Sequence, residues 1–334
     1  MFLFLTKMEK GYMNKTHEKK VWNIVQITLL VAPLLICILV FTIIPIILTF
    51  QKSLKFYPYQ SNKTIYSYNF GNYKNIFNDP QFGSAILNTT LALFLGTATS
   101  MILALIFAII VEHLVSKRAR SAFLTLIYSQ FFISSFAVGI AFTMFFGSKS
   151  LFFKLIRTEY GFTSGSKRLP IWLYYSIFQT WRSLPFNLVL FASAINRGNI
   201  KYTKLSLNDK LTIWQKTKYI YFNEIQKVFF AILFTNFIFA ALLLPDAIVE
   251  KSYNIDVHQA HTLTSYTIKF AGGGANPVLK FEKGYASAFF SFAYLVFLLM
   301  LILMLLPSSI RKFIRFIKFK KTKRNKAKVV KNEL

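Results

Sequence analysis

Acidic residues are scarce in this sequence of 334 residues, which has 12 Asp and Glu against 40 Lys and Arg and a formal net charge of +28. Charged residues make up 16% of the chain, whereas soluble domains carry about 25%. The apolar residues, 54% of the chain, come in long blocks without the period of a soluble helix or strand. This pattern excludes an ordinary globular enzyme, a disordered tail and a collagen-like repeat. It also excludes a nucleic-acid binder, because such proteins do not place most of their length in uncharged runs.

Several groups that carry chemistry are missing as well. The single cysteine, Cys37, excludes a disulfide framework and a thiolate metal site. The pattern G-x-x-x-x-G-K-[ST] is absent, so the chain does not bind ATP through a P-loop of its own. His258 and His261 lie near Asp256, but so short a pattern with no predicted helix to hold it does not indicate zinc. We therefore expect no catalytic residues, no metal and no cofactor.

The sequence contains long apolar blocks. Six of them are long enough to span a bilayer, which takes about 20 residues. They lie at about 22–50, 84–111, 122–147, 171–194, 228–248 and 285–307. Helices are expected, because backbone polar groups in lipid must be satisfied within the segment. The sequence therefore predicts an all-α, polytopic membrane protein with six transmembrane helices.

The basic residues indicate which way the spans run. The N-terminus, the second and fourth connections and the tail hold 26 Lys and Arg over 91 residues, and the three remaining connections hold 13 over 92. By the positive-inside rule, both ends lie in the cytoplasm. The predicted organisation is a basic N-terminus at 1–21, a six-span domain at 22–307 and a basic tail at 308–334 that faces anionic lipid headgroups.

Arg182 is a basic residue inside a predicted span, close to Pro185. A guanidinium near the middle of the membrane costs about 2.5–3.5 kcal/mol on insertion scales and normally faces a bundle interior or a watery path. Arg182 is therefore a candidate pathway residue. Two alternatives remain open: a bond to carbonyls that Pro185 frees, and a position nearer the outer surface.

The connection at 195–227 is too long for a simple link, and it mixes seven basic residues with Leu, Ile, Trp and Tyr. The pattern predicts two short helices, near Ile200–Leu207 and Thr212–Phe222, which Asn208-Asp209-Lys210 separate. Asn-Asp is a turn or N-cap signal for the second helix. Apolar residues on such a loop indicate a partner surface, or a helix pair that rests on lipid.

The same loop carries a resemblance to a known family. Lys204-Leu205-Ser206-Leu207-Asn208-Asp209-Lys210-Leu211, followed by Trp214, Ile220 and Phe222, resembles the E-A-A-x-x-D-G-A…I-x-L-P loop of binding-protein-dependent ABC importer permeases. Four further motifs resemble that family over about 22–307: Phe70-Gly71-Asn72-Tyr73 with Asp79-Pro80, Asn88-Thr89, Trp181 to Ala192, and Gly284-Tyr285-Ala286-Ser287-Ala288.

This resemblance implies that the loop is a coupling loop, which docks on a cytoplasmic ATPase subunit. The residues that it assigns to the loop are Lys204, Leu205, Ser206, Asp209, Lys210, Leu211, Trp214, Ile220 and Phe222. Lys210 replaces the family's Gly after the Asp, and a left-handed turn costs such a residue about 1–2 kcal/mol.

The function that the resemblance implies is that of a permease subunit in the bacterial inner membrane. Such a subunit forms half of the path for a small solute, a sugar, sugar alcohol or glycerol phosphate. Its implied partners are a second permease subunit in a heterodimer, two cytoplasmic ATP-binding subunits, an extracellular substrate-binding protein and the lipid bilayer. A stand-alone ion-coupled or facilitative carrier is the alternative, but it predicts buried carboxylates and inverted repeats. A membrane scaffold without transport would also explain the loop and the tail.

Overall fold

The computed structural model describes residues 22, 26–58, 65–113, 116–147, 151–163, 167–250, 252–274 and 277–305. The predicted segments at 1–21 and 308–334 lie outside these residues. Within the described part the chain is mostly helical, with two short strand pairs and the loops that connect the elements. The helical fold predicted from the apolar blocks is therefore confirmed.

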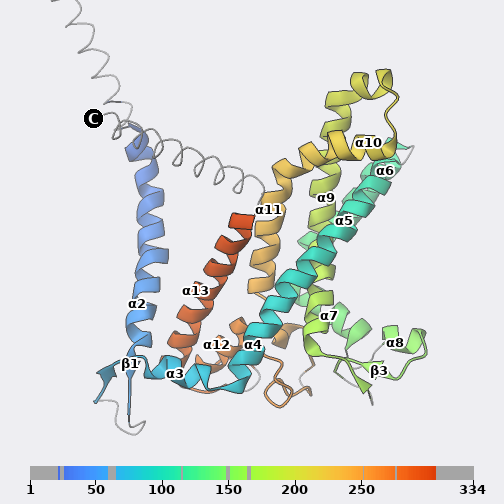
Figure 1. Cartoon of the computed structure of the whole chain (residues 1–334). Coiled ribbons are helices and arrows are strands. Elements are labelled where there is room, and N and C mark those ends of the chain that lie inside the picture. The colour runs from blue at the N-terminus through green and yellow to red at the C-terminus, as the bar shows by residue number, and fades with distance from the viewer. Residues whose placement is uncertain are drawn as a thin grey trace, which may run out of the picture.

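The elements run in the following order (Figure 1). They are η1 (Leu39–Ile43), α2 (Ile44–Ser53), β1 (Lys55–Phe56), β2 (Ser67–Tyr68), α3 (Gly71–Phe77), α4 (Pro80–Leu91), η2 (Ala92–Gly96), α5 (Thr97–Glu112), α6 (Lys117–Ser129), η3 (Gln130–Phe132), α7 (Ser135–Phe146), α8 (Leu151–Leu155), β3 (Tyr160–Gly161), β4 (Lys167–Arg168), α9 (Ile171–Asn208), α10 (Ile213–Lys216), η4 (Thr217–Tyr221), α11 (Phe222–Ala241), η5 (Pro245–Ala247), α12 (Leu263–Phe270) and α13 (Phe281–Leu305). Strands β1 and β2 pair antiparallel, and β3 and β4 pair parallel.

Five helices of the described chain are long and apolar enough to cross a membrane. They are Gln26–Ser53, Pro80–Glu112, Ala137–Leu155, Ile213–Ala241 and Phe281–Met304. The block expected at 171–194 forms the first part of α9 but is not among the five. Polar side chains such as Gln179, Arg182 and Asn187 lower its hydropathy. The count of six spans stays a prediction.

The expected continuous span at 122–147 is wrong. The helix breaks after Phe132, where Ile133 has an extended backbone with φ −77° and ψ 137°. Ser134 then begins α7, and its hydroxyl accepts a hydrogen bond from the Ala137 N–H at 3.2 Å. A serine N-cap satisfies the free donors of a new helix, so two helices replace the single one that hydropathy predicts.

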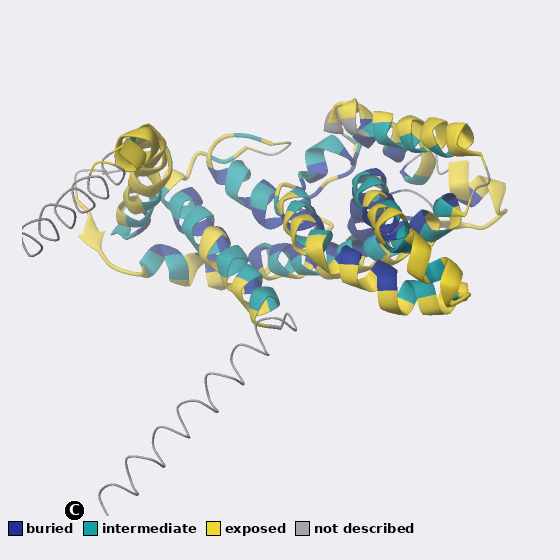
Figure 2. Ribbon diagram, turned by 90° about the horizontal axis from the view of Figure 1, so that it is seen from above, coloured by how far each residue is buried: buried dark blue, intermediate teal, exposed yellow. Residues whose placement is uncertain are grey.

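The first apolar helix stands at one side of the bundle (Figure 1), where α2 packs along α13. The Phe50 and Phe289 rings meet at 4.7 Å. Figure 2 shows the exposed colour over most of this helix, and no residue from Gln26 to Lys52 is buried. Its apolar surface therefore remains free for lipid or for another chain.

A polar seam joins α5, α9 and α11 in the interior of the bundle. The Asn187 amide donates to Ser100 at 2.8 Å and exchanges hydrogen bonds with Asn236 at 2.9 and 3.3 Å. Ser183 donates to Ser100 at 2.7 Å. These four side chains are buried. In lipid there is no hydrophobic driving force between apolar side chains. Helices in a membrane are therefore held together by close packing at small residues and by interhelical hydrogen bonds.

Aromatic rings fill the interior at the other end of α9. Phe142 of α7 lies 4.9 Å from the Tyr174 ring and 5.1 Å from the Phe178 ring. The Tyr174 and Tyr175 hydroxyls donate to the Ile248 and Ala260 carbonyls, both at 2.5 Å. The rings thus attach the segment between α11 and α12 to α9.

The connections near α3 and α12 form what we call the loop end of the bundle (Figure 1). Asn88 donates to the Gln259 and His261 carbonyls at 3.1 and 2.9 Å, and the Leu263 N–H donates to Thr89 at 2.9 Å. The Asn88-Thr89 pair of the sequence motif therefore holds the chain where α12 begins.

Asp79 links α4, α12 and α13 at the loop end. It accepts hydrogen bonds from the Tyr266 hydroxyl and the Lys283 ammonium, each at 2.7 Å. Burial raises the pKa of Asp79. The hydrogen bonds from Lys283 and Tyr266 and the charge of Lys283 together lower it by more, so the pKa lies below its ordinary value. The carboxylate therefore stays charged and holds the three helices together.

Gly96 offers a test of the approach between α5 and α9. A Cβ at this position would lie 2.7 Å from the Gln179 side chain and 2.9 Å from the Ser176 carbonyl. We expect Gly96→Ala to lower the free energy of unfolding by about 1–3 kcal/mol, the usual cost of overpacking. The measurement is the melting temperature of the purified protein in detergent.

Gly83→Ala is the matched control, because nothing lies within 4 Å of its added Cβ. The control should be neutral or should stabilise α4 by about 0.5–1 kcal/mol. Equal melting temperatures for the two variants would contradict the close approach.

Candidate functional site

The segment at 200–222 folds as a helical hairpin that extends α9 and α11 beyond the neighbouring helices (Figure 1). Its first arm follows a kink in α9 (Ile171–Asn208), and the helical segment beyond the kink corresponds to the short helix expected near Ile200–Leu207. A local kink lies at Tyr202, with φ −113° and ψ 20°. The backbone at Tyr202 is non-helical, so two helices meet at this kink.

The turn of the hairpin is a Schellman motif. The Leu211 N–H donates to the Ser206 carbonyl at 3.2 Å, and the Lys210 N–H donates to the Leu207 carbonyl at 3.3 Å. Lys210 has φ +46°, the left-handed conformation that usually selects glycine at this position. The turn therefore has the left-handed geometry that usually calls for glycine, although a lysine stands at this position.

The second arm begins at Thr212, and not at the Asn208-Asp209 pair expected as its N-cap. The Thr212 hydroxyl accepts a hydrogen bond from the Gln215 N–H, while the Gln215 side chain accepts one from the Thr212 N–H. This capping box satisfies two free donors. The arm then continues through η4 into α11, so that both arms of the hairpin are extensions of bundle helices.

The residues that the resemblance assigns to the loop differ in exposure. Those that are exposed are Lys204, Leu205, Asp209, Lys210, Trp214 and Phe222. Ser206 and Leu211 are half-buried. Ile220 is buried, and a Cβ on Gly198 of the facing arm would meet it at 3.0 Å. Ile220 therefore joins the two arms, and the others form the surface or the turn.

Four helices meet at the base of the hairpin through a chain of polar contacts, which we call the base relay. The Glu112 carboxylate accepts from Arg120 of α6 at 2.9 Å and from Asn199 of α9 at 2.8 Å. Asn199 in turn accepts from the Tyr221 hydroxyl of η4 at 2.9 Å. The Glu112 side chain is 5% exposed. Hydrogen bonds thus connect the base of the hairpin to α5 and α6.

Sequence reasoning did not find the base relay. The only available signal was Glu112 itself, an acidic residue at the end of an apolar block in a chain with few acids. Asn199 and Tyr221 are 22 residues apart, and Asn199 and Glu112 are 87 apart. Only the packed bundle brings them together.

Arg182 is half-buried on α9, and its guanidinium lies over the Phe239 ring of α11 at 4.6 Å. None of the ion pairs found in the described residues includes Arg182. Within the described residues, no hydrogen bond joins Arg182 to a carbonyl near Pro185. The alternative that Arg182 binds carbonyls freed by Pro185 therefore receives no support. A cation stacked on an aromatic face stays available to an anion.

The two histidines of the H-x-x-H pattern have separate partners. His261 is buried and contacts Asp256 at 2.8 Å and Ser265 at 3.0 Å. His258 stacks on Tyr253, with the ring centroids 4.6 Å apart, and contacts Arg168. Over the described residues, no cluster of three or more His, Cys, Asp and Glu could hold a metal ion.

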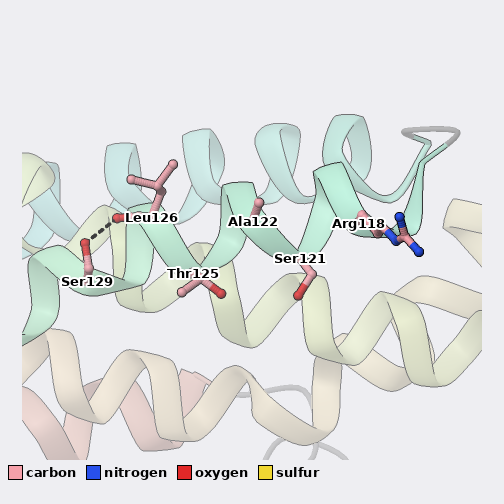
Figure 3. A pocket seen from close by; sticks show the side chains of 6 residues that line it. All are labelled: Arg118, Ser121, Ala122, Thr125, Leu126 and Ser129. Carbon is pink, nitrogen blue, oxygen red and sulfur yellow. Dashed lines mark hydrogen bonds between the residues drawn. The ribbon is translucent and has the colours of Figure 1, made fainter.

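A shallow groove of about 600 Å³ runs along α6 (Figure 3). It is lined by Arg118, Ser121, Ala122, Thr125, Leu126 and Ser129. All of these residues come from the same helix, and the Ser129 hydroxyl donates to the Leu126 carbonyl at 2.6 Å. The groove brings no functional groups from separate elements together.

The left-handed conformation of Lys210 predicts opposite effects on stability for glycine at two positions of the hairpin. Lys210→Gly should raise the stability of the turn by about 1 kcal/mol, because glycine adopts this conformation without a Cβ clash. Lys204→Gly, inside α9, should lower it by about 1 kcal/mol, because glycine is a poor helix former. Hydrogen exchange at the amides of 205–212 measures both. The same sign in both variants would contradict the turn geometry.

The base relay predicts an order of stabilities. Glu112→Leu leaves Arg120 and Asn199 without their acceptor and should cost on the order of 3 kcal/mol. Glu112→Gln keeps one acceptor and should cost less. The exposed Glu159→Gln is the control and should change the free energy of unfolding by less than about 0.5 kcal/mol. Thermal melting in detergent measures all three, and a Leu variant as stable as the control would argue against the relay.

Comparison with known proteins gives related permeases. No protein-family model matches the sequence. The chain is 26% identical over 193 residues to "Probable ABC transporter permease protein MG188" of Mycoplasma genitalium, a match over 54% of this chain and 56% of the relative. It is 24% identical over 175 residues to the MG188 homolog of Mycoplasma pneumoniae, over 50% of this chain and 52% of the relative. The matches thus span about half the length of these curated relatives.

Solved structures share the fold. One is the crystal structure of a bacterial ABC transporter involved in the import of the acidic polysaccharide alginate, with a TM-score of 0.60, 19% identity, and coverage of 83% of this chain and 96% of that chain. The alginate transporter in complex with a periplasmic protein that binds alginate pentasaccharide also has a TM-score of 0.60 and 19% identity, over 85% of this chain and 94% of that chain. This multi-pass membrane protein therefore has the fold of an ABC transporter permease and resembles such permeases in sequence.

Proposed function

We propose that this chain is the permease subunit of an ATP-driven importer and forms half of the path for a small solute. The observation that carries the proposal is the hairpin, an exposed element that extends two bundle helices in a fold similar to that of ABC permeases. Sequence similarity to two ABC transporter permeases supports it. The stand-alone carrier has no comparable support, because these relatives are permeases of ABC transporters.

The hairpin is the contact with the ATP-binding subunit in this proposal. Trp214 is 83% exposed and Leu207 is 69% exposed at its tip. Large apolar side chains that a fold leaves uncovered outside the membrane indicate a protein partner. Closure of two ATP-binding subunits would displace the hairpin, and the base relay would carry the movement to α5, α6 and α9. Movement of rigid helix groups about an interface is the usual form of such a change.

The arrangement in the membrane follows from the hairpin. The hairpin end and both termini would lie in the cytoplasm, with six spans across the inner membrane of a bacterium and the segments at 1–21 and 308–334 as basic flanks. A second permease subunit, different from this chain, would complete the path. The exposed apolar surface of Gln26–Ser53 is available for such a partner. A substrate-binding protein would deliver the solute at the loop end, as the periplasmic protein of the alginate transporter complex suggests.

Arg182 is the proposed pathway residue. Its guanidinium lies on α9 within the predicted fourth span, over the Phe239 ring of α11. Such a cation favours a solute with negative charge, such as a glycerol phosphate, over a neutral sugar. The import of an acidic polysaccharide by the alginate transporter is compatible with this preference.

Removal of the exposed indole tests the proposed function. The tagged full-length chain is purified from native membranes in mild detergent, and the co-purified proteins are identified by mass spectrometry and by ATP hydrolysis. We expect an ATP-binding subunit and a second six-span protein with the wild type, and loss of the ATP-binding subunit alone with Trp214→Ala, because a central exposed Trp carries much of an interface's affinity.

Leu155→Ala is the matched control, since Leu155 is also 83% exposed but lies in α8, far along the chain from the hairpin. This variant should retain both partners. Absence of an ATP-hydrolysing subunit from the wild type would contradict the permease assignment.

A further inference from the structure

The surface of the hairpin carries a strong excess of positive charge. Six basic residues lie between 197 and 218: Arg197, Lys201, Lys204, Lys210, Lys216 and Lys218. Five of them are exposed and Lys216 is half-buried. Asp209 is the only carboxylate in the same stretch. None of the six belongs to an ion pair within the described part of the chain.

These cations surround apolar side chains. Ile200, Leu205, Leu207, Ile213, Trp214, Tyr219 and Phe222 are exposed on the same two arms. Lys201 lies 5.1 Å from the centre of the Tyr202 ring, and Lys218 lies 5.4 Å from that of Tyr219. The hairpin thus presents apolar and aromatic surface bordered by basic groups, of which Lys201 and Arg197 also interact electrostatically with Glu224 of α11.

The tip stands clear of the apolar part of the bundle. The Asn199 and Glu112 side chains are hydrogen-bonded at 2.8 Å, so the two residues lie at the same height along the bundle. Glu112 is the last residue of the apolar helix Pro80–Glu112. Nine residues separate Asn199 from Asn208, with the kink at Tyr202 between them. A straight helix of this length would rise about 13 Å, and the kink shortens that height. Figure 1 shows the turn beyond the ends of α5 and α6. A turn beyond the ends of these helices is accessible to a protein partner.

We propose that the hairpin selects its partner by charge, and that the partner is an ATP-binding subunit whose receiving groove has an apolar floor and an acidic rim. This inference rests on the proposed function. Complementary charges at an interface speed association and exclude wrong partners, while a buried aromatic anchor supplies most of the affinity. In this interface Trp214 is the anchor and the lysines form the rim.

The test measures the salt dependence of partner recovery. The full-length wild type and a variant with Lys201, Lys204, Lys210 and Lys218 changed to Gln are purified in neutral detergent between 50 and 400 mM NaCl. Glutamine keeps helix propensity close to that of lysine. We expect wild-type recovery of the ATP-binding subunit to fall with salt, and recovery with the variant to be lower by about tenfold at low salt and nearly independent of salt.

Two further variants serve as controls. Changing Lys74, Lys154, Lys167 and Lys280 to Gln removes the same charge from exposed positions outside the hairpin and should match the wild type. Trp214→Ala should lose the subunit at every salt concentration. Circular dichroism and thermal melting establish that the variants are equally folded.

The outcomes separate this inference from the proposed function. If the hairpin lysine variant recovers the ATP-binding subunit with the wild-type salt dependence while Trp214→Ala loses it, the charge selection is overturned and the permease function stands. If the lysine substitutions reduce only binding to phosphatidylglycerol vesicles, and not recovery of the ATP-binding subunit, the lysines bind lipid. That result also overturns the inference. If no variant or wild type recovers an ATP-hydrolysing subunit, both proposals fall.

Discussion

The contact between α5 and α9 is the interaction on which the rest of the structure depends. Between helices in lipid the hydrophobic effect contributes little, so close backbone approach and hydrogen bonds must hold them together. Gly96 permits the approach, and Ser100, Ser183 and Asn187 supply the bonds. Asn236 extends the seam to α11. Because α9 and α11 also form the arms of the hairpin, the seam determines where the hairpin stands.

The same group of helices is joined again at the hairpin end. Glu112 connects α5 to Arg120 of α6 and to Asn199 of α9, and Tyr221 completes the base relay. A hairpin held only by its two arms could bend independently of the bundle. With a seam in the interior and a relay at the base, α5, α9 and α11 form one unit, and a force applied at the tip acts on all three helices. This arrangement is the physical basis for the proposed coupling.

Much of the fold was predictable because hydropathy is a local property. The apolar blocks indicated three of the five apolar helices closely, and the 195–227 segment was correctly expected to carry helices and exposed apolar residues. The sequence left the shape of the turn at Lys210 open, and the structure gives it the left-handed conformation, with φ +46°. The predictions failed where short-range chemistry competes with hydropathy: Ser134 begins a new helix within the third block, and Thr212, with Gln215 three residues later, caps the second arm in place of Asn208-Asp209.

The sequence by itself determined the class of protein and the presence of a basic, apolar surface loop, since length, hydropathy and charge need no knowledge of neighbours. Only the tertiary structure decided which residues of that loop face outward, since Ile220 and Trp214 are both apolar yet one is buried and the other is 83% exposed. It also decided the partners of Glu112 and Asn187, which lie 87 and 49 residues from Asn199 and Asn236. Contacts over such separations depend on how the helices pack, and no local pattern encodes them.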